Sequence, residues 1–185
     1  MTEMARLIDQ AALNSNPENR CWIVRALGEH ESSLVRYAMM FVGDVDRARD
    51  IVQDTFLKLC RHAKEQGQEL EETNLKGWLY RVCRNRAIDI CRKENRMKVV
   101  EPNELDVAED ANQPSQRLQQ HESAEQLDKQ ISELPKQQQE ALRLKYQGGL
   151  SYREIAEVMG TTTNNVGVLL HTAIGKLRLQ LGPES

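Results

Sequence analysis

The chain has few aromatic residues, and this scarcity limits what its core can be made of. Only 4% of its 185 residues are Phe, Trp or Tyr, although 39% are hydrophobic in total. Such a core must rest on Leu, Ile, Val and Ala, which suits small bundles of helices. We find no convincing alternation of polar and apolar residues of the kind that predicts a β-strand. The expected fold class is therefore all-α.

Long apolar runs are also missing. No stretch approaches the ~20 apolar residues that a membrane helix needs, and the N-terminal MTEMARLIDQ lacks the basic-then-apolar pattern of a signal peptide. Charged residues make up 29% of the chain and the mean hydropathy is −0.63. We therefore expect a soluble, cytoplasmic protein without membrane insertion, built as one ordinary domain or two small ones.

The sequence has little that would support catalysis. It has no Gly-rich phosphate loop, and its four histidines are scattered. The four cysteines include no CxxC pair. A zinc site built on Cys83 and Cys91 would need further ligands such as Cys60 or His62, and buried free thiols in a reducing compartment are the favoured interpretation. We expect no catalytic residue, no metal and no cofactor.

Charge is distributed unevenly along a chain whose net charge is −3. From Lys76 to Lys98, eight Lys or Arg stand against two acidic residues. A basic stripe on an acidic chain suggests that a polyanion is bound at one place. From Glu101 to Glu125 there are seven acidic residues and one arginine. With Pro102, Pro114 and several Gln and Asn, the first part of this stretch is typical of a flexible linker.

Helical periodicity before the linker predicts three helices. The first helix spans residues 18–42 and the third spans about 75–97. The second begins at a cap formed by Asp44 or Asp46 and ends near residue 62. At 100° per residue, one face of the third helix gathers apolar side chains: Leu79, Cys83, Ala87 and Ile90. A separate arc carries Trp78, Arg81, Asn85, Asp89, Arg92 and Arg96. We interpret Trp78 as a core residue rather than a platform for stacking bases.

After the linker, helical signals resume at about 117–132, and Pro135 suits the first position of a helix that runs to Tyr146. Ser151 and Glu154 form a capping-box pattern, and Gly160 supplies a left-handed helix end. The last helix has a buried stripe of Val166, Leu169, Leu170, Ala173 and Leu177. A short helix, a turn containing Gly and a second helix predict a helix-turn-helix. A plain helical hairpin is the alternative.

These segments resemble the bacterial sigma factors of the sigma-70 family. The segment from LPKQQQEALRLKYQGGLSYREIAEVMG onward is similar to their fourth conserved region, DRARDIVQDTFLKLCRH to region 2.2, and GWLYRVCRNRAIDICRKENR to regions 2.3 and 2.4. Two such regions with a short linker are similar to the extracytoplasmic-function (ECF) group. The resemblance implies an N-terminal extension (1–17), a region 2 helical domain (18–98), a linker (99–122) and a region 4 helix-turn-helix domain (123–182). It also implies binding to core RNA polymerase, promoter recognition and strand opening.

The resemblance assigns the basic stripe to the unpaired non-template strand of the −10 element. The residues expected to contact this strand are Arg81, Arg84, Asn85, Arg92 and Arg96. Arginine neutralises phosphates, and an asparagine amide pairs with a base edge. The helix near 46–62 is expected to dock on the coiled coil of the polymerase beta-prime subunit through Asp46, Asp50, Gln53, Asp54 and Lys58. Acids ringed by apolar residues suit an arginine-bearing partner helix.

Region 4 is expected to contact the polymerase beta flap and the −35 element. The −35 residues would be Arg153, Thr163, Asn164, Asn165, Val168, His171 and Lys176. The last helix departs from the family, because its exposed face carries only Lys176 and Arg178 as fixed positive charges. We therefore expect a weak, salt-sensitive −35 contact. Factors of this group are commonly held inactive by an anti-sigma protein that clamps both domains, although no residue here identifies that partner.

A conventional helix-turn-helix regulator, binding duplex DNA without polymerase, is the alternative function. It would account for residues 134–180 and leave both the acidic 46–58 face and the basic 78–96 stripe without a role. Co-purification with core polymerase distinguishes the two hypotheses.

Overall fold

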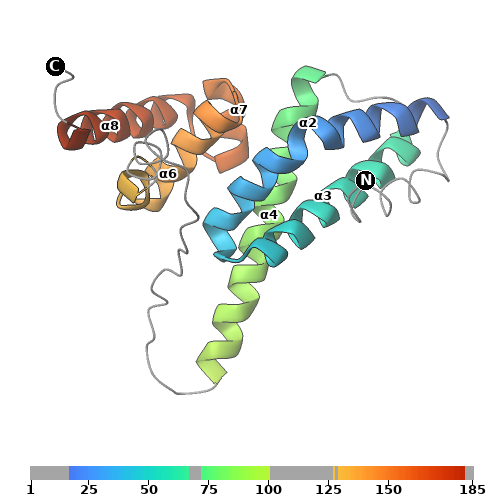
Figure 1. The fold of residues 1–185 in the computed structure, drawn as a ribbon, viewed down its shortest axis with the longest axis horizontal. Helices are drawn as coiled ribbons and strands as arrows, with labels where there is room; N and C mark the ends of the chain where they lie inside the picture. Colours follow the sequence, from blue (N-terminus) through green and yellow to red (C-terminus); the bar gives the residue numbers. More distant parts are fainter. Residues whose placement is uncertain (1–16, 67–71, 101–126, 128, 182–185) are drawn as a thin grey trace, which may run out of the picture.

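The part of the protein that the structure describes is built from helices (Figure 1). The computed structural model describes residues 17–66, 72–100, 127 and 129–181, and this part of the chain has no strand. The predicted all-α class is confirmed. Our expectations for residues 1–16 and for the linker beyond residue 100 lie outside the described residues.

The first module consists of α2 (Pro17–Val42), α3 (Val45–Gln66) and α4 (Glu72–Val100), which pack on one another. Asp44 caps α3 by accepting a hydrogen bond from the Arg47 backbone N–H at 2.8 Å. The three predicted helices are confirmed. Helices α3 and α4 extend further than the apolar periodicity indicated.

One face of α4 is buried, as predicted. Leu79, Cys83 and Ala87 are fully buried against the core, and Ile90 is partly buried. Trp78 also packs against the core, but it keeps part of its surface exposed and its ring centroid lies 5.6 Å from that of His62. This supports the interpretation of Trp78 as a packing residue.

The second module consists of α6 (Lys136–Leu142), the π-helical turn η1 (Arg143–Gln147), α7 (Tyr152–Met159) and α8 (Thr163–Leu181). The sequence predicted one α-helix up to Tyr146. The helix instead widens after Leu142, where the Gly148 N–H donates to the Arg143 carbonyl at 3.0 Å. A π-type turn has no simple sequence signal, and π-turns often occur at functional sites.

Both ends of α7 have the predicted caps. The Ser151 hydroxyl accepts a hydrogen bond from the Glu154 N–H, and the Glu154 carboxylate accepts one from the Ser151 N–H at 2.7 Å. Gly160 ends α7 with φ 66° and ψ 42°, in the left-handed region. The predicted stripe of α8 is buried except for the partly buried Leu169.

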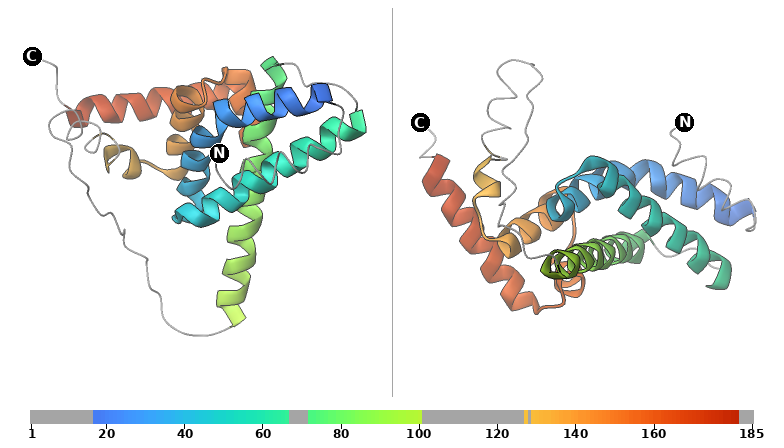
Figure 2. Two further views of the ribbon diagram at one scale, coloured as in Figure 1. Left: turned by 45° about the vertical axis from the view of Figure 1, so that its right-hand side comes forward. Right: turned by 90° about the horizontal axis from the view of Figure 1, so that it is seen from below.

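The two modules pack directly against each other, which the sequence did not predict. Helix α7 contacts α4, and η1 contacts α2. Both modules contribute to one buried core, in which Tyr37 and Tyr80 belong to the first module and Leu144 and Leu150 to the second. Figure 2 shows that α4 passes α2 and α3 and then projects beyond the other helices.

Substitutions of two glycines test the backbone conformations at the end of α7 and inside α8. Gly160→Ala places a Cβ in a left-handed conformation, so we expect the free energy of unfolding to fall by about 1 kcal/mol. Gly175 lies inside α8 with nothing within 4 Å of an added Cβ, so Gly175→Ala should raise it by up to about 1 kcal/mol. Urea unfolding followed by far-UV circular dichroism measures both. Equal effects of the two substitutions would contradict these backbone assignments.

Candidate nucleic-acid interface

The exposed face of α4 carries four of the five residues predicted to contact a single strand. Arg81, Asn85, Arg92 and Arg96 are all exposed, and we call this set the basic ridge. Because Arg81, Asn85 and Arg92 recur at spacings of four and seven, they lie along one side of the helix. The C-terminal end of α4 projects beyond α2 and α3 (Figure 1). The amide of Asn85 is therefore flanked by guanidinium groups on an accessible surface.

Arg84, the fifth predicted residue, is placed differently. Its side chain is only 21% exposed, and its Nε donates a 2.6 Å hydrogen bond to Oε1 of Glu140, on α6 of the second module. Burial acts to lower the pKa of the Arg84 guanidinium, but the hydrogen bond and charge of Glu140 outweigh it and raise that pKa. In this arrangement Arg84 binds the second module and is not presented beside the basic ridge.

A tyrosine completes this contact. The Tyr37 hydroxyl donates a 2.8 Å hydrogen bond to the same oxygen of Glu140. Burial, reinforced by the negative charge of Glu140, raises the pKa of Tyr37 well above its ordinary value. The Glu140 carboxylate, whose side chain is 6% exposed, therefore receives hydrogen bonds from two helices of the first module. A buried carboxylate requires such partners, because desolvation of an unpaired charge is costly.

Sequence reasoning missed Glu140 and Tyr37. A signal was present, because Glu140 lies four residues before the buried Leu144, on the same helical face. An acidic residue on an apolar face indicates a buried basic partner. The sequence could not show that this partner belongs to the other module.

The predicted polymerase-binding residues lie along α3. Asp46, Asp50 and Lys58 are exposed, whereas Gln53 and Asp54 are partly exposed. Asp54 accepts a 2.7 Å hydrogen bond from Nε of Arg86 on α4. An ion pair between Arg47 and Glu94 also joins α3 to α4. The acidic residues of α3 and the basic ridge of α4 therefore lie on two helices that pack against each other and are joined by ion pairs.

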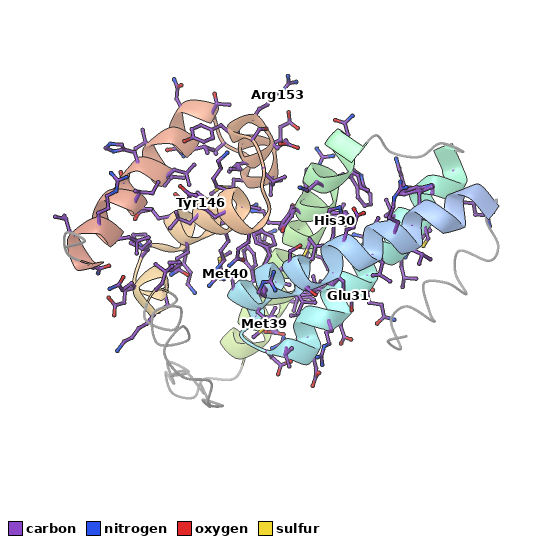
Figure 3. The ribbon with its side chains drawn as sticks, turned by 45° about the horizontal axis from the view of Figure 1, so that its top comes forward. His30, Glu31, Met39, Met40, Tyr146 and Arg153 are labelled. Carbon is purple, nitrogen blue, oxygen red and sulfur yellow. The ribbon has the colours of Figure 1, made fainter. Side chains whose placement is uncertain are left out.

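The predicted −35 residues are all exposed at one end of the second module and along α8. The Arg153 side chain is 86% exposed and points outward from α7 (Figure 3), and Val168 is 62% exposed. The side-chain amide of Asn165 already has a partner in the turn before α8, because its Nδ2 donates a 2.9 Å hydrogen bond to Thr161 Oγ1. Tyr152, which the sequence pattern did not single out, is also exposed, and the Lys145 Nζ lies 5.4 Å from its ring centroid.

The thiols do not form a metal site in the described part of the chain. Cys60, Cys83 and Cys91 are free, and no group of three or more His, Cys, Asp or Glu among the described residues could hold a metal ion. Burial raises the pKa of Cys83 to about 12. The zinc site considered from the sequence therefore has no ligand cluster among the described residues.

None of the described helices is long and apolar enough to cross a membrane.

Comparisons with known families match both modules. A family model described as Sigma-70 region 2 matches residues 27–97, and one described as Sigma-70, region 4 matches residues 124–177. The ECF RNA polymerase sigma factor EcfG of Rhodopseudomonas palustris is 30% identical over 146 residues, which cover 78% of this chain and 77% of that protein. The RNA polymerase sigma factor SigV of Bacillus subtilis is 28% identical over 162 residues, covering 88% and 92%.

Solved structures agree. The sigma factor RpoE of Bartonella quintana, in complex with the anti-sigma factor NepR, superimposes with a TM-score of 0.67 at 26% identity, covering 87% of this chain and 97% of that one. CnrH, in complex with the cytosolic domain of CnrY, matches with a TM-score of 0.57 over 99% and 100% of the two chains. At 20% identity, the CnrH match supports the fold alone.

The placement of the arginines predicts unequal effects on single-strand binding. Arg92→Ala and Arg96→Ala should each reduce the slope of log affinity against log salt by ~0.7, the value for one lost phosphate contact on a single strand. Arg84→Ala should reduce it less, because Glu140 engages Arg84 in the free chain. Fluorescence anisotropy with a labelled oligonucleotide measures the slopes, and Arg49→Ala on α3 is the control. Equal reductions for Arg84 and Arg92 would contradict this placement.

Proposed function

The chain belongs to the extracytoplasmic-function group of RNA polymerase sigma factors, and on this basis we propose which of its surfaces meet DNA and which meet polymerase. A sigma factor performs no catalysis of its own. It binds core RNA polymerase, brings it to promoters and supports the opening of the strands. We assign these roles to individual residues of this chain, acting in the cytoplasm.

The basic ridge holds the unpaired non-template strand of the −10 element. Asn85 pairs with a base edge, while Arg81, Arg92 and Arg96 neutralise phosphates. Arg84 joins them when the second module has moved away. Separated strands expose both the edges and the faces of their bases, which suits an accessible amide. The single observation that carries this proposal is the exposed Asn85 between arginines, on the side of α4 away from its buried residues.

The α3 surface docks on the beta-prime coiled coil of the polymerase. Asp46, Asp50 and Lys58 are exposed for this contact, and Gln53 and Asp54 lie at its edge. Exposed carboxylates steer an arginine-bearing helix into register by complementary charge. The Asp54–Arg86 ion pair fixes this surface relative to α4. Docking of α3 therefore also orients the basic ridge.

The second module reads the −35 element weakly and contacts the beta flap. The predicted base-reading side chains Asn164, Val168 and His171 are exposed on α8, with Arg153 on α7. Asparagine pairs with adenine, and an apolar side chain contacts the thymine methyl. Fixed positive charge on the exposed face of α8 is limited to Lys176 and Arg178. Phosphate attraction is correspondingly small, so promoter choice depends mainly on the first module.

An anti-sigma factor is a further proposed partner. The RpoE structure that this chain resembles contains one, NepR. The alternative of a regulator that acts without polymerase accounts only for residues 134–180 and gives no role to the segment matched by Sigma-70 region 2.

Run-off transcription with purified core polymerase tests the proposed function, and sequencing of the transcript 5′ ends identifies the promoters. Asn85→Ala should lower output roughly tenfold and reduce discrimination at the −10 element, because a good base contact contributes about 1–3 kcal/mol. Asn164→Ala is the matched control, since it should affect only the response to −35 changes. Loss of −35 rather than −10 discrimination in Asn85→Ala would contradict the assignment.

Charge reversal on α3 tests the polymerase contact. Asp50→Lys should weaken association with core polymerase by roughly tenfold or more, because it places like charges across the interface. Asp89→Lys, a reversal of an exposed acid on α4, should leave association unchanged. Titration of labelled protein with core polymerase measures both. If the two variants bind equally well, α3 is not the docking surface.

A further inference from the structure

One carboxylate of the proposed polymerase-binding surface is already bound to the helix that carries the basic ridge. Asp54 of α3 accepts a 2.7 Å hydrogen bond from Nε of Arg86 on α4. We propose that Arg86 is a further strand-binding residue, and that an arginine of the polymerase takes its place on Asp54 when α3 docks. The inference rests on the proposed function, because it takes α3 to meet polymerase and α4 to meet the unpaired strand.

Arg86 lies at the edge of the basic ridge, on the flank of α4 that faces α3. It directly follows Asn85, so the Cα atoms of these two residues lie ~3.8 Å apart. Around the helix axis Arg86 is turned about 100° from Asn85. Lys93 follows Arg86 by seven residues, so it lies on the same flank, and it is exposed. A guanidinium released from Asp54 therefore reaches a phosphate beside the base that Asn85 pairs with.

The ion pair between Arg86 and Asp54 is accessible enough to be exchanged. The Arg86 side chain is 35% exposed and the Asp54 side chain is 40% exposed. Their hydrogen bond uses Nε, and the terminal nitrogens of a guanidinium carry further donors for other acceptors. Ion pairs at such positions contribute little to stability, because water and salt screen them. Breaking this pair therefore costs little and leaves no charge buried without a partner.

The chemistry of the three groups favours the exchange. A guanidinium binds a carboxylate most strongly through two parallel hydrogen bonds. Arg86 engages Asp54 through Nε to one oxygen, Oδ2, so an arginine that approaches both oxygens from a docking helix is the better ligand. The released Arg86 binds phosphate through the same planar set of donors that it used for the carboxylate. Each positive group keeps an anionic partner before and after docking.

Another paired acid of α3 does not offer this exchange. Asp46 is bound at 3.1 Å by Arg49, which lies three residues further along the same helix. Displacing Arg49 would release a cation on α3 and not on α4. Core packing and the ion pair between Arg47 and Glu94 still hold α3 against α4 after the exchange. Asp54 is therefore a residue that the proposed polymerase-binding surface shares with the strand-binding helix.

Binding of the free full-length chain to a labelled single-stranded oligonucleotide tests whether Asp54 restrains Arg86. Asp54→Asn keeps the side-chain shape but removes the charge, so we expect the affinity to rise several-fold. In the double variant Asp54→Asn/Arg86→Gln this gain over Arg86→Gln should vanish, because the released guanidinium is missing. Glu65→Gln removes an exposed acid from the same helix and is the matched control for net charge. A gain in Asp54→Asn no larger than in Glu65→Gln, or a gain that persists in the double variant, overturns the proposal.

The assembled holoenzyme tests the role of Arg86 in binding the strand. On the non-template strand of a promoter mapped by run-off transcription, Arg86→Gln should reduce the slope of log affinity against log salt by ~0.7, the value for one lost phosphate contact. In the free chain the same substitution should leave the slope unchanged, because Asp54 holds Arg86 there. Arg86→Lys keeps the charge and should restore most of the slope. A residue that merely braces α3 against α4 would not show this dependence on polymerase.

The outcomes separate this inference from the proposed function. If the wild-type chain initiates transcription with core polymerase but Arg86→Gln leaves the salt slope of the holoenzyme unchanged, the inference is overturned and the assignments of α3 and α4 stand. If the wild-type chain does not associate with core polymerase, the proposed function fails. The comparison of Asp54→Asn with the double variant in the free chain, which requires no polymerase, then decides whether Asp54 restrains Arg86.

Discussion

The structure depends on the two faces of α4. One face is buried against α2 and α3 through Leu79, Cys83 and Ala87, and the other carries Arg81, Asn85, Arg92 and Arg96 in solvent. Helix α4 contacts α2 and α3 of the first module and α7 of the second. Because helical geometry fixes the angle between these faces, packing of the core also sets the direction in which the basic ridge points. Core packing and the proposed nucleic-acid binding thus involve the same helix.

The ion pairs around α4 divide into two kinds. Arg86 with Asp54, and Arg47 with Glu94, join α4 to α3 within the first module, on partly exposed surfaces where such pairs contribute little to stability. Arg84 with Glu140 joins α4 to the second module and is largely buried. The first kind fixes α3, with the proposed polymerase-binding residues, relative to α4 and its basic ridge. The second kind joins Arg84, a residue predicted to contact DNA, to the second module.

Much of the fold was predictable because the signals are local. Apolar residues at helical spacing predicted α2, α3, α4 and α8, and Ser151, Glu154 and Gly160 predicted the ends of α7. The π-turn after Leu142 and the commitment of Arg84 to Glu140 were not predictable. A π-turn has no simple sequence signal, and the Arg84–Glu140 pair joins segments more than fifty residues apart in the chain. Helical periodicity placed Arg84 outside the arc of the basic ridge, but it reports only the face on which a residue lies and not what covers it. The pairing of Arg84 with Glu140 could therefore not be predicted.

The central claim is that Asn85 and its neighbouring arginines hold an unpaired strand while the chain is bound to polymerase. Photo-crosslinking from position 85 in the assembled holoenzyme, on a promoter whose non-template strand is labelled base by base, tests it most directly. Crosslinks confined to unpaired bases of the −10 element are the predicted result. Crosslinks only to duplex DNA, or to no DNA at all in a complex that initiates transcription, would contradict the account.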